Sequence, residues 1–178
     1  MQHLKTTLIL LIALVLGAGL FIWLGVYNPG ADNPHWKITY DILQNVRDRA
    51  IANHATGIIL PADLDDPKTV LKGAGQYAAM CTECHLAPGK KNSEMRPGLY
   101  PQPPNLSETH VNLQEAFWVI KHGLKMTAMP AWGKNHDDAT IWSIVAFLHK
   151  LPDMTPAQYK EIVAKAPPDE EMENDHQH

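Results

Sequence analysis

The longest run of hydrophobic positions lies near the start of the chain. Residues 7–27 read TLILLIALVLGAGLFIWLGVY and carry no charge over 21 positions, close to the ~20 that a helix needs to cross a bilayer. A cleavable signal peptide has a shorter apolar core of roughly 7–15 residues, and this run continues well past the small residues at 17–19. We therefore expect an uncleaved anchor at 1–27, with a membrane helix spanning about 7–27.

The flanks of this run suggest an orientation. Lys5 precedes it with no acidic residue before it, which favours a cytoplasmic N-terminus, and Trp23 and Tyr27 suit the opposite membrane interface. In a bacterium this arrangement gives a single-pass protein of the cytoplasmic (inner) membrane. The remainder of the chain would then lie in the periplasm.

The segment 28–65 is predicted to be a linker that contains an amphipathic helix. We expect this helix at 35–53, beginning near Pro34 behind a cap from Asp32 or Asn33. Its apolar positions recur at helical spacing: Trp36, Tyr40, Leu43, Val46 and Ala50. It could lie on the membrane, dock on the core or face a partner, and ordinary packing on the core is favoured.

The rest of the chain alternates helical periodicity with proline- and glycine-rich loops. In chain order we expect a helix at 67–80 capped by Asp66, a loop at 87–109, a helix at 112–122, a loop at 123–133, a helix at 139–151 capped by Asp137 or Asp138, and a short helix at 155–166. No strand pattern is present, so the fold class is all-α. The domain should cover 66–152, followed by an extension at 153–178 whose acidic tail is predicted to be disordered.

Charge excludes one class of function. The chain of 178 residues has a formal net charge of -4 and no block of Lys and Arg, so it does not resemble a nucleic-acid-binding protein.

The chemistry of the chain is concentrated at 80–89, which read MCTECHLAPG. This stretch holds the only two cysteines, Cys81 and Cys84, followed directly by His85. Cys-x-x-Cys alone fits a redox disulfide or half of a zinc site, whereas a following His is typical of c-type haem attachment. Two thiols one helical turn apart can each bond one vinyl group of a porphyrin edge, and the histidine can then bind iron. Haem is favoured, although a disulfide is also compatible with a location outside the cytoplasm.

An electron-carrying haem usually takes a second axial ligand from the protein. Three methionines are placed to serve, namely Met95, Met126 and Met129. Met129 is the best candidate because Pro130 restricts its backbone to extended conformations within the loop. Met126 is the direct rival.

Taken together, the motifs resemble a class I c-type cytochrome, of the membrane-anchored, monohaem bacterial kind. They are Gly73-x-x-x-Tyr77-x-x-x-Cys81-x-x-Cys84-His85, then PPNL at 103–106, MPAWG at 129–133 and IWSIVAFLHKLP at 141–152. The resemblance covers about 66–152. It implies a helical domain around one covalently bound haem c per chain.

The resemblance also implies roles for individual residues. Cys81 and Cys84 would form the thioether bonds, His85 would be the proximal ligand of the iron, and Met129 the distal ligand. The first and last core helices would cross at Gly73, with Tyr77 near Trp142 or Phe147.

Further residues are candidates for the surroundings of the haem. Arg96 is a candidate partner of a haem propionate. Six residues are candidate walls of the pocket: Leu86, Tyr100, Pro104, Leu106, Trp118 and Trp132. Residues 66–152 carry nine Lys and Arg against seven Asp and Glu, and five lysines flank the loops expected around the haem edge: Lys90, Lys91, Lys121, Lys125 and Lys134. Such a basic rim would attract redox partners with acidic docking faces, although an ordinary solvated face is slightly favoured.

These observations predict an electron carrier rather than an enzyme, moving single electrons between respiratory-chain partners on the periplasmic side. The main alternative is a permanent subunit of a membrane dehydrogenase or terminal oxidase complex. A haem enzyme or gas sensor would need an open iron position, against which Met129 argues. A tethered thiol oxidoreductase would need a fold with strands.

Overall fold

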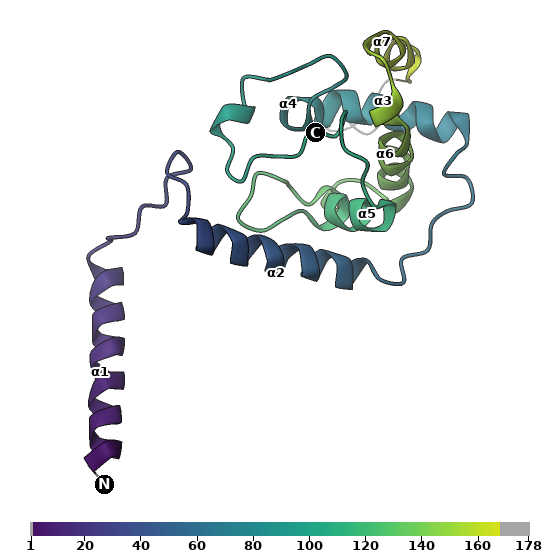
Figure 1. Cartoon of the computed structure of the whole chain (residues 1–178). Helices are drawn as coiled ribbons and strands as arrows, with labels where there is room; N and C mark the ends of the chain where they lie inside the picture. Colours follow the sequence, from purple (N-terminus) through teal and green to yellow (C-terminus); the bar gives the residue numbers. More distant parts are fainter. Residues whose placement is uncertain (1, 168–178) are drawn as a thin grey trace, which may run out of the picture. The chain divides into compact units, whose positions relative to one another are not determined.

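The computed structural model describes residues 2–167, which form helices and loops without a strand (Figure 1). The chain divides into two compact units, Met1–Pro34 and His35–His178. Its helices are α1 (Gln2–Trp23), α2 (Lys37–Ala55), α3 (Pro67–Met80), α4 (Thr82–His85), α5 (Leu113–His122), α6 (Asp138–Lys150) and α7 (Pro156–Lys165), with single turns η1 (Arg96–Gly98), η2 (Trp132–Lys134) and η3 (Leu151–Asp153). The predicted all-α class is confirmed. The prediction of a disordered acidic tail concerns residues outside the described part.

The first unit contains one long apolar helix. By length and composition α1 could cross a membrane, and none of its residues is buried within the protein. It ends at Trp23, short of the predicted end at Tyr27. The reason is local, because Gly25 adopts a φ of +61° and the backbone leaves the helix there.

The core of the second unit is the crossing of α3 and α6. Gly73 lies against the backbone of Ser143, so closely that a Cβ on Gly73 would be 1.9 Å from the Ser143 carbonyl oxygen. Next to this contact the rings of Tyr77 and Phe147 lie 5.4 Å apart. The expected helix crossing is therefore present with Phe147 opposite Tyr77. Trp142 instead stacks on Phe117 of α5 at 4.1 Å.

Helix α2 packs on α5, but through a different face from the predicted one. Its buried residues are Ile51 and Ala55. Of the predicted apolar positions, Trp36, Leu43 and Val46 are exposed. The predicted caps Asp32 and Asn33 are also wrong, since Trp36 precedes the first turn and supplies no side-chain cap.

Helix α7 closes the second unit against α3. A capping box of Thr155 and Gln158 starts it, its Tyr159 ring lies 6.3 Å from that of Phe147, and Ala166, just beyond its end, lies beside Gly75 of α3. The predicted helices at 112–122 and 155–166 are thus confirmed to within a residue or two. The predicted loop at 87–109 contains the single turn η1.

Asp137 starts α6, and its removal gives a first prediction. Its carboxylate accepts a hydrogen bond from the Thr140 amide at 2.7 Å, and this bond holds the pKa of Asp137 below its usual value. Asp137→Ala should lower the free energy of unfolding by about 1 kcal/mol, measured by denaturant titration of the haem-loaded protein.

The effect of Asp137→Ala should depend on pH. Since the folded-state pKa is depressed, the carboxylate stabilises the fold above its unfolded-state pKa and loses this effect as pH falls through the folded-state pKa. The difference between Asp137→Ala and the wild type should therefore shrink in acid. Asp137→Asn, which can cap without ionising, is the matched control, and a difference that stays constant into acid would contradict the explanation.

Candidate functional site

One helical turn brings Cys81, Cys84 and His85 together at the end of α3. Cys81 ends α3 with its amide donating to the Tyr77 carbonyl, and the His85 amide donates to the Cys81 carbonyl at 2.8 Å. The two cysteines do not form a disulfide with each other. Cys81 packs against the core, where burial raises the pKa of its thiol to about 12.

His85 is oriented by a backbone contact that sequence reasoning did not identify. Its Nδ1 lies 3.0 Å from the Pro104 carbonyl oxygen, and with a proton on Nδ1 the lone pair of Nε2 is left for a metal. Burial lowers the pKa of His85 against the opposing effect of the Pro104 hydrogen bond, and the charge of Arg96 acts in the same direction as burial. A neutral imidazole with one fixed nitrogen is the form that binds iron.

Leu86, directly after His85, has an unusual backbone conformation that its surroundings fix. Leu86 has a φ of +64°, a conformation that costs a non-glycine residue ~1–3 kcal/mol and persists only when its surroundings fix it. Here the buried Leu86 side chain and the Tyr77 hydroxyl, which donates to the Leu86 carbonyl at 2.6 Å, fix it. The Leu106 amide donates to the His85 carbonyl and joins the following loop to the same turn.

The loop at 87–109 folds back on the attachment turn. The Arg96 guanidinium donates to the Cys84 carbonyl at 3.0 Å, and the Ser93 hydroxyl donates to the Glu83 carbonyl. Arg96, expected beside a haem propionate, therefore supports the backbone of Cys84.

A second loop presents Met129 to the core. Gly123 has a φ of +65°, and a Cβ there would lie 2.6 Å from the Pro130 carbonyl carbon, so the loop is folded directly onto this glycine. The Leu124 amide donates to the Met129 carbonyl, and the Met129 amide donates to the Thr127 hydroxyl. The partly buried Met129 packs against the core. In the view of Figure 1 this loop and the loop at 87–109 extend to the same side of α6.

The rival methionines are placed differently. Met126 adopts a φ of +58° and is 90% exposed, and Met95 is 54% exposed. Of the three candidates, Met129 is the one whose backbone and side chain the fold holds inward. The Gly123 that supports it follows α5 directly, and a glycine after a predicted helix was the available sequence signal.

Of the six predicted wall residues, Pro104 supplies the carbonyl beside His85, and the other five divide into two groups. Leu86 is buried, and Leu106 and Trp132 pack partly buried against the core. Tyr100 and Trp118 instead have partners on the α2 side. Tyr100 lies against the rings of His35 and Tyr40, and Trp118 stacks on His54 of α2 at 5.2 Å.

The predicted basic rim is weaker than the count of lysines suggests. Lys90 forms an ion pair with Glu83 at 3.1 Å, and Lys121 pairs with Asp138 at 2.7 Å. Within residues 2–167 the other three have no ion-pair partner: Lys91, Lys125 and Lys134. Of the five lysines, these three are the ones whose charge no ion pair offsets within the described residues.

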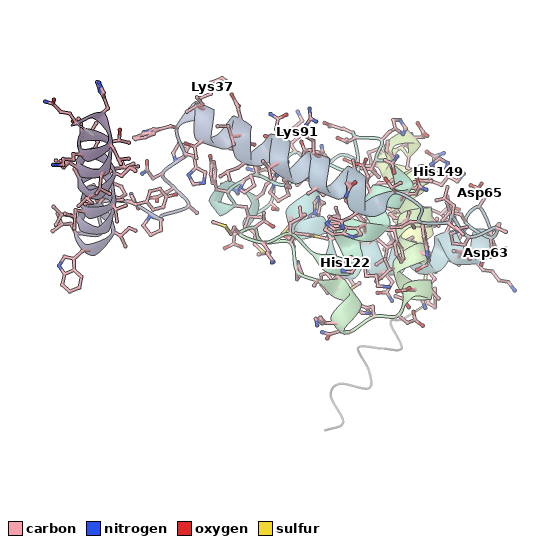
Figure 2. The ribbon with its side chains drawn as sticks, turned by 90° about the horizontal axis from the view of Figure 1, so that it is seen from below. Lys37, Asp63, Asp65, Lys91, His122 and His149 are labelled. Carbon is pink, nitrogen blue, oxygen red and sulfur yellow. The ribbon has the colours of Figure 1, made fainter. Side chains whose placement is uncertain are left out.

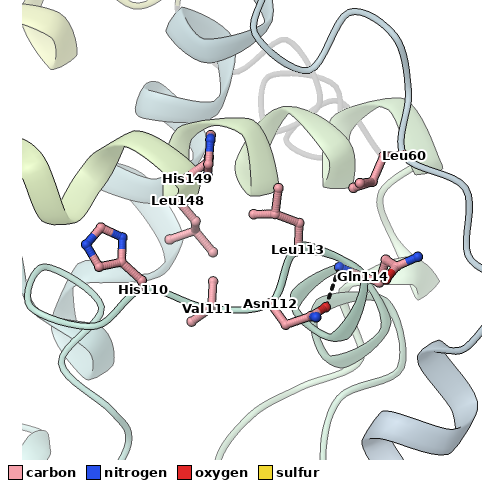
Figure 3. A pocket seen from close by; sticks show the side chains of 8 residues that line it. All are labelled: Leu60, His110, Val111, Asn112, Leu113, Gln114, Leu148 and His149. Atoms are coloured by element: carbon pink, nitrogen blue, oxygen red, sulfur yellow. Dashed lines mark hydrogen bonds between the residues drawn. The ribbon is translucent and has the colours of Figure 1, made fainter.

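A small pocket lies between the start of α5 and the end of α6, and its lining includes none of Cys81, Cys84, His85 and Met129 (Figure 3). It is lined by Leu60, His110, Val111, Asn112, Leu113, Gln114, Leu148 and His149. Two of its polar side chains already serve the fold, since Asn112 caps α5 and the Gln114 amide group donates to the Ile58 carbonyl at 2.6 Å. We assign it no part in the chemistry of Cys81–His85.

The geometry does not support the two other hypotheses for the cysteines, a zinc site and a thiol oxidoreductase. In the described part of the chain no three residues of the types His, Cys, Asp and Glu gather as metal ligands, whereas a structural zinc site needs four ligands. Strands, which the thiol oxidoreductase hypothesis requires, are likewise not found at 2–167.

Comparison with known proteins supports the remaining hypothesis, c-type haem attachment. No curated protein and no solved structure matches the chain. Residues 68–148, however, match the family described as cytochrome C oxidase, cbb3-type, subunit III. The matched stretch contains both the Cys81–His85 turn and the loop of Met129, and it identifies this part of the chain as a c-type cytochrome domain, an electron-carrying domain whose cofactor is covalently bound haem c.

Proposed function

We propose that the protein is a membrane-anchored, single-haem carrier that passes single electrons between respiratory-chain partners on the periplasmic side. Cys81 and Cys84 hold the haem through thioether bonds, His85 is its proximal ligand and Met129 its distal ligand. The observation that carries this assignment is the 3.0 Å contact between His85 Nδ1 and the Pro104 carbonyl oxygen. With Nδ1 donating to this carbonyl, Nε2 of the neutral imidazole is left to bind a metal, as in metal-binding histidines.

The chain's own residues fit a carrier better than a catalyst. The bound haem c supplies an iron that exchanges one electron between its ferric and ferrous states. Met129 contributes a neutral thioether, which favours the ferrous state, and Gly123 and Thr127 hold it in position. With His85 and Met129 as ligands no position is left for a substrate, which disfavours an enzyme or gas sensor.

Helix α1 serves as the anchor in this proposal. Its length and composition fit a single pass, and Lys5 before the span favours a cytoplasmic start. Anchoring keeps the carrier near membrane partners and raises its effective concentration there. Lys91, Lys125 and Lys134 offer attraction to partners with acidic docking faces.

One alternative has a specific observation in its favour. The matched family is described as a subunit of an oxidase, so this chain could be a permanent subunit of a membrane dehydrogenase or terminal oxidase. Purification in a mild detergent separates the two proposals. A stoichiometric set of partner subunits supports the complex, and a haem protein that elutes alone supports the free carrier.

The covalent attachment itself is tested on a denaturing gel. The wild-type chain from cells competent in haem attachment should stain for haem, and Cys81→Ala combined with Cys84→Ala should abolish the stain at equal immunoblot intensity. Met126→Ala is the control and should stain like the wild type. An unstained wild-type band, or a stain that survives the double substitution, would contradict the proposal.

A further inference from the structure

Helix α2 has a second apolar face that the fold leaves uncovered. While Ile51 and Ala55 face α5, five apolar residues of and just before α2 are exposed; we call them the outer face of α2: Trp36 (84%), Ile38 (68%), Ile42 (57%), Leu43 (50%) and Val46 (62%). Ile38, Ile42 and Val46 recur every four residues and form a stripe along one side of the helix. A continuous apolar face of this kind marks an interaction site.

The charges of α2 favour an anionic occupant. Its two carboxylates are neutralised within the helix, Asp41 by Lys37 at 2.6 Å and Asp48 by Arg47 at 3.0 Å. Arg49, three residues after Val46, is exposed and has no ion-pair partner within residues 2–167. Figure 2 views the unit from the side of α2, with Lys37 at its first turn. The helix therefore combines an apolar stripe with an uncompensated cation.

The length of the preceding chain restricts where this face can be. Residues 24–36 separate the end of α1 from the start of α2, and they span at most about 45 Å even when fully extended. If α1 crosses a bilayer, as the proposed function requires, α2 always remains close to that bilayer. A tethered surface meets the membrane at high effective concentration, so weak apolar and ionic contacts suffice.

We infer that the outer face of α2 lies in the boundary between headgroups and acyl chains of the bilayer that α1 anchors. Trp36 suits the headgroup level because its ring is apolar and its N–H is polar. Ile42 and Val46 enter the apolar boundary, and Arg49 binds anionic phosphate groups, the arrangement of an interfacial amphipathic helix.

This contact would also orient the haem domain. At the start of α2 the His35 amide donates to the Tyr100 hydroxyl at 3.1 Å, and the Tyr40 ring lies 5.9 Å from that of Tyr100. Tyr100 belongs to the loop whose Arg96 holds the Cys84 carbonyl. Seating α2 on lipid thereby fixes the direction in which the Cys81–His85 turn faces.

The inference is tested on the full-length, haem-loaded protein, reconstituted at one copy per nanodisc of phosphatidylcholine with a minority of phosphatidylglycerol. A spin label is attached at Ile42→Cys, with Leu14→Cys in α1 and Lys160→Cys on the exposed side of α7 as controls. Cys81 and Cys84 do not take the label when bonded to haem. Collision rates with oxygen, which enters lipid, are compared with those of a water-soluble nickel chelate.

We expect the label at Ile42 to favour oxygen several-fold over the label at Lys160, as the label at Leu14 does. If Leu14 favours oxygen while Ile42 favours nickel, the inference fails and the anchor stands. If Ile42 is shielded from both reagents, protein rather than lipid covers the face and the inference also fails. If Leu14 itself favours nickel, the anchor of the proposed function fails together with the inference.

Discussion

Replacing Gly73 with alanine should lower the free energy of unfolding by about 3 kcal/mol, the upper part of the range for overpacked cores. The added Cβ would meet backbone rather than a flexible side chain, at 1.9 Å from the Ser143 carbonyl oxygen and 3.0 Å from the Phe147 Cβ. Relief requires α3 and α6 to separate, and that would loosen Tyr77 from Phe147. Since Tyr77 also holds the Leu86 carbonyl, the attachment turn should loosen too.

Gly75 of the same helix provides the matched control for this substitution. A Cβ there would lie 3.0 Å from the Ala166 Cβ, at the end of α7, which can move away at little cost. Because alanine also favours a helix over glycine by ~1 kcal/mol, Gly75→Ala should stay within about 1 kcal/mol of the wild type. Denaturant unfolding of the haem-loaded proteins measures both. Equal losses for the two variants would show that the Gly73 contact does not determine the crossing.

The starts of the core helices could be predicted because their causes are local. Asp66 before Pro67 and Asp137 before α6 cap helices through bonds to amides two or three residues away, which a short window of sequence contains. The end of α1 also has a local cause, Gly25. Because the uncharged run continues to Tyr27, the sequence nevertheless predicted the end of the helix at Tyr27. An apolar run predicts membrane compatibility better than it predicts where a helix stops.

The buried face of α2 could not be predicted by periodicity. Apolar residues occur on both sides of this helix, with Ile51 and Ala55 on one side and Ile42 and Val46 on the other. Which side is covered depends on contact with α5, far away in the sequence. The apolar positions outside the buried face are then left for another partner, and for this reason the failed prediction became informative.

The candidate site also combines a local motif, which the sequence predicts, with contacts between distant residues, which it does not. The Cys81–His85 turn is a local motif and its residues adjoin as expected, whereas the Pro104 carbonyl that orients His85 is 19 residues away. Pairing of Lys121 with Asp138, 17 residues apart, likewise reduced the basic rim below the level that counting predicted. Hydrogen bonds and ion pairs between residues far apart in the sequence depend on how the helices and loops pack, so identifying them requires the structure.

Replacing Met129 should produce the largest change in redox behaviour. Met129→Ala should lower the reduction potential by a few tenths of a volt, part of the roughly 0.8 V range over which axial ligands tune haem. The reason is the loss of a neutral, soft thioether that favours ferrous iron. The weak charge-transfer band of methionine-ligated ferric haem should disappear with it. Redox titration and absorption spectra measure the two effects.

The loss of the sulfur ligand must be distinguished from the loss of packing, because the Met129 side chain also contacts the core. Met129→Leu keeps the apolar volume but has no sulfur, and such swaps usually cost less than ~1.5 kcal/mol. It should therefore remain folded and still lose the band and the high potential. Met126→Ala should change neither, since the Met126 side chain is almost fully exposed. If Met126→Ala removed the band while Met129→Leu kept it, the sulfur bound to iron would be that of Met126, which the left-handed backbone at that residue would then have to turn inward.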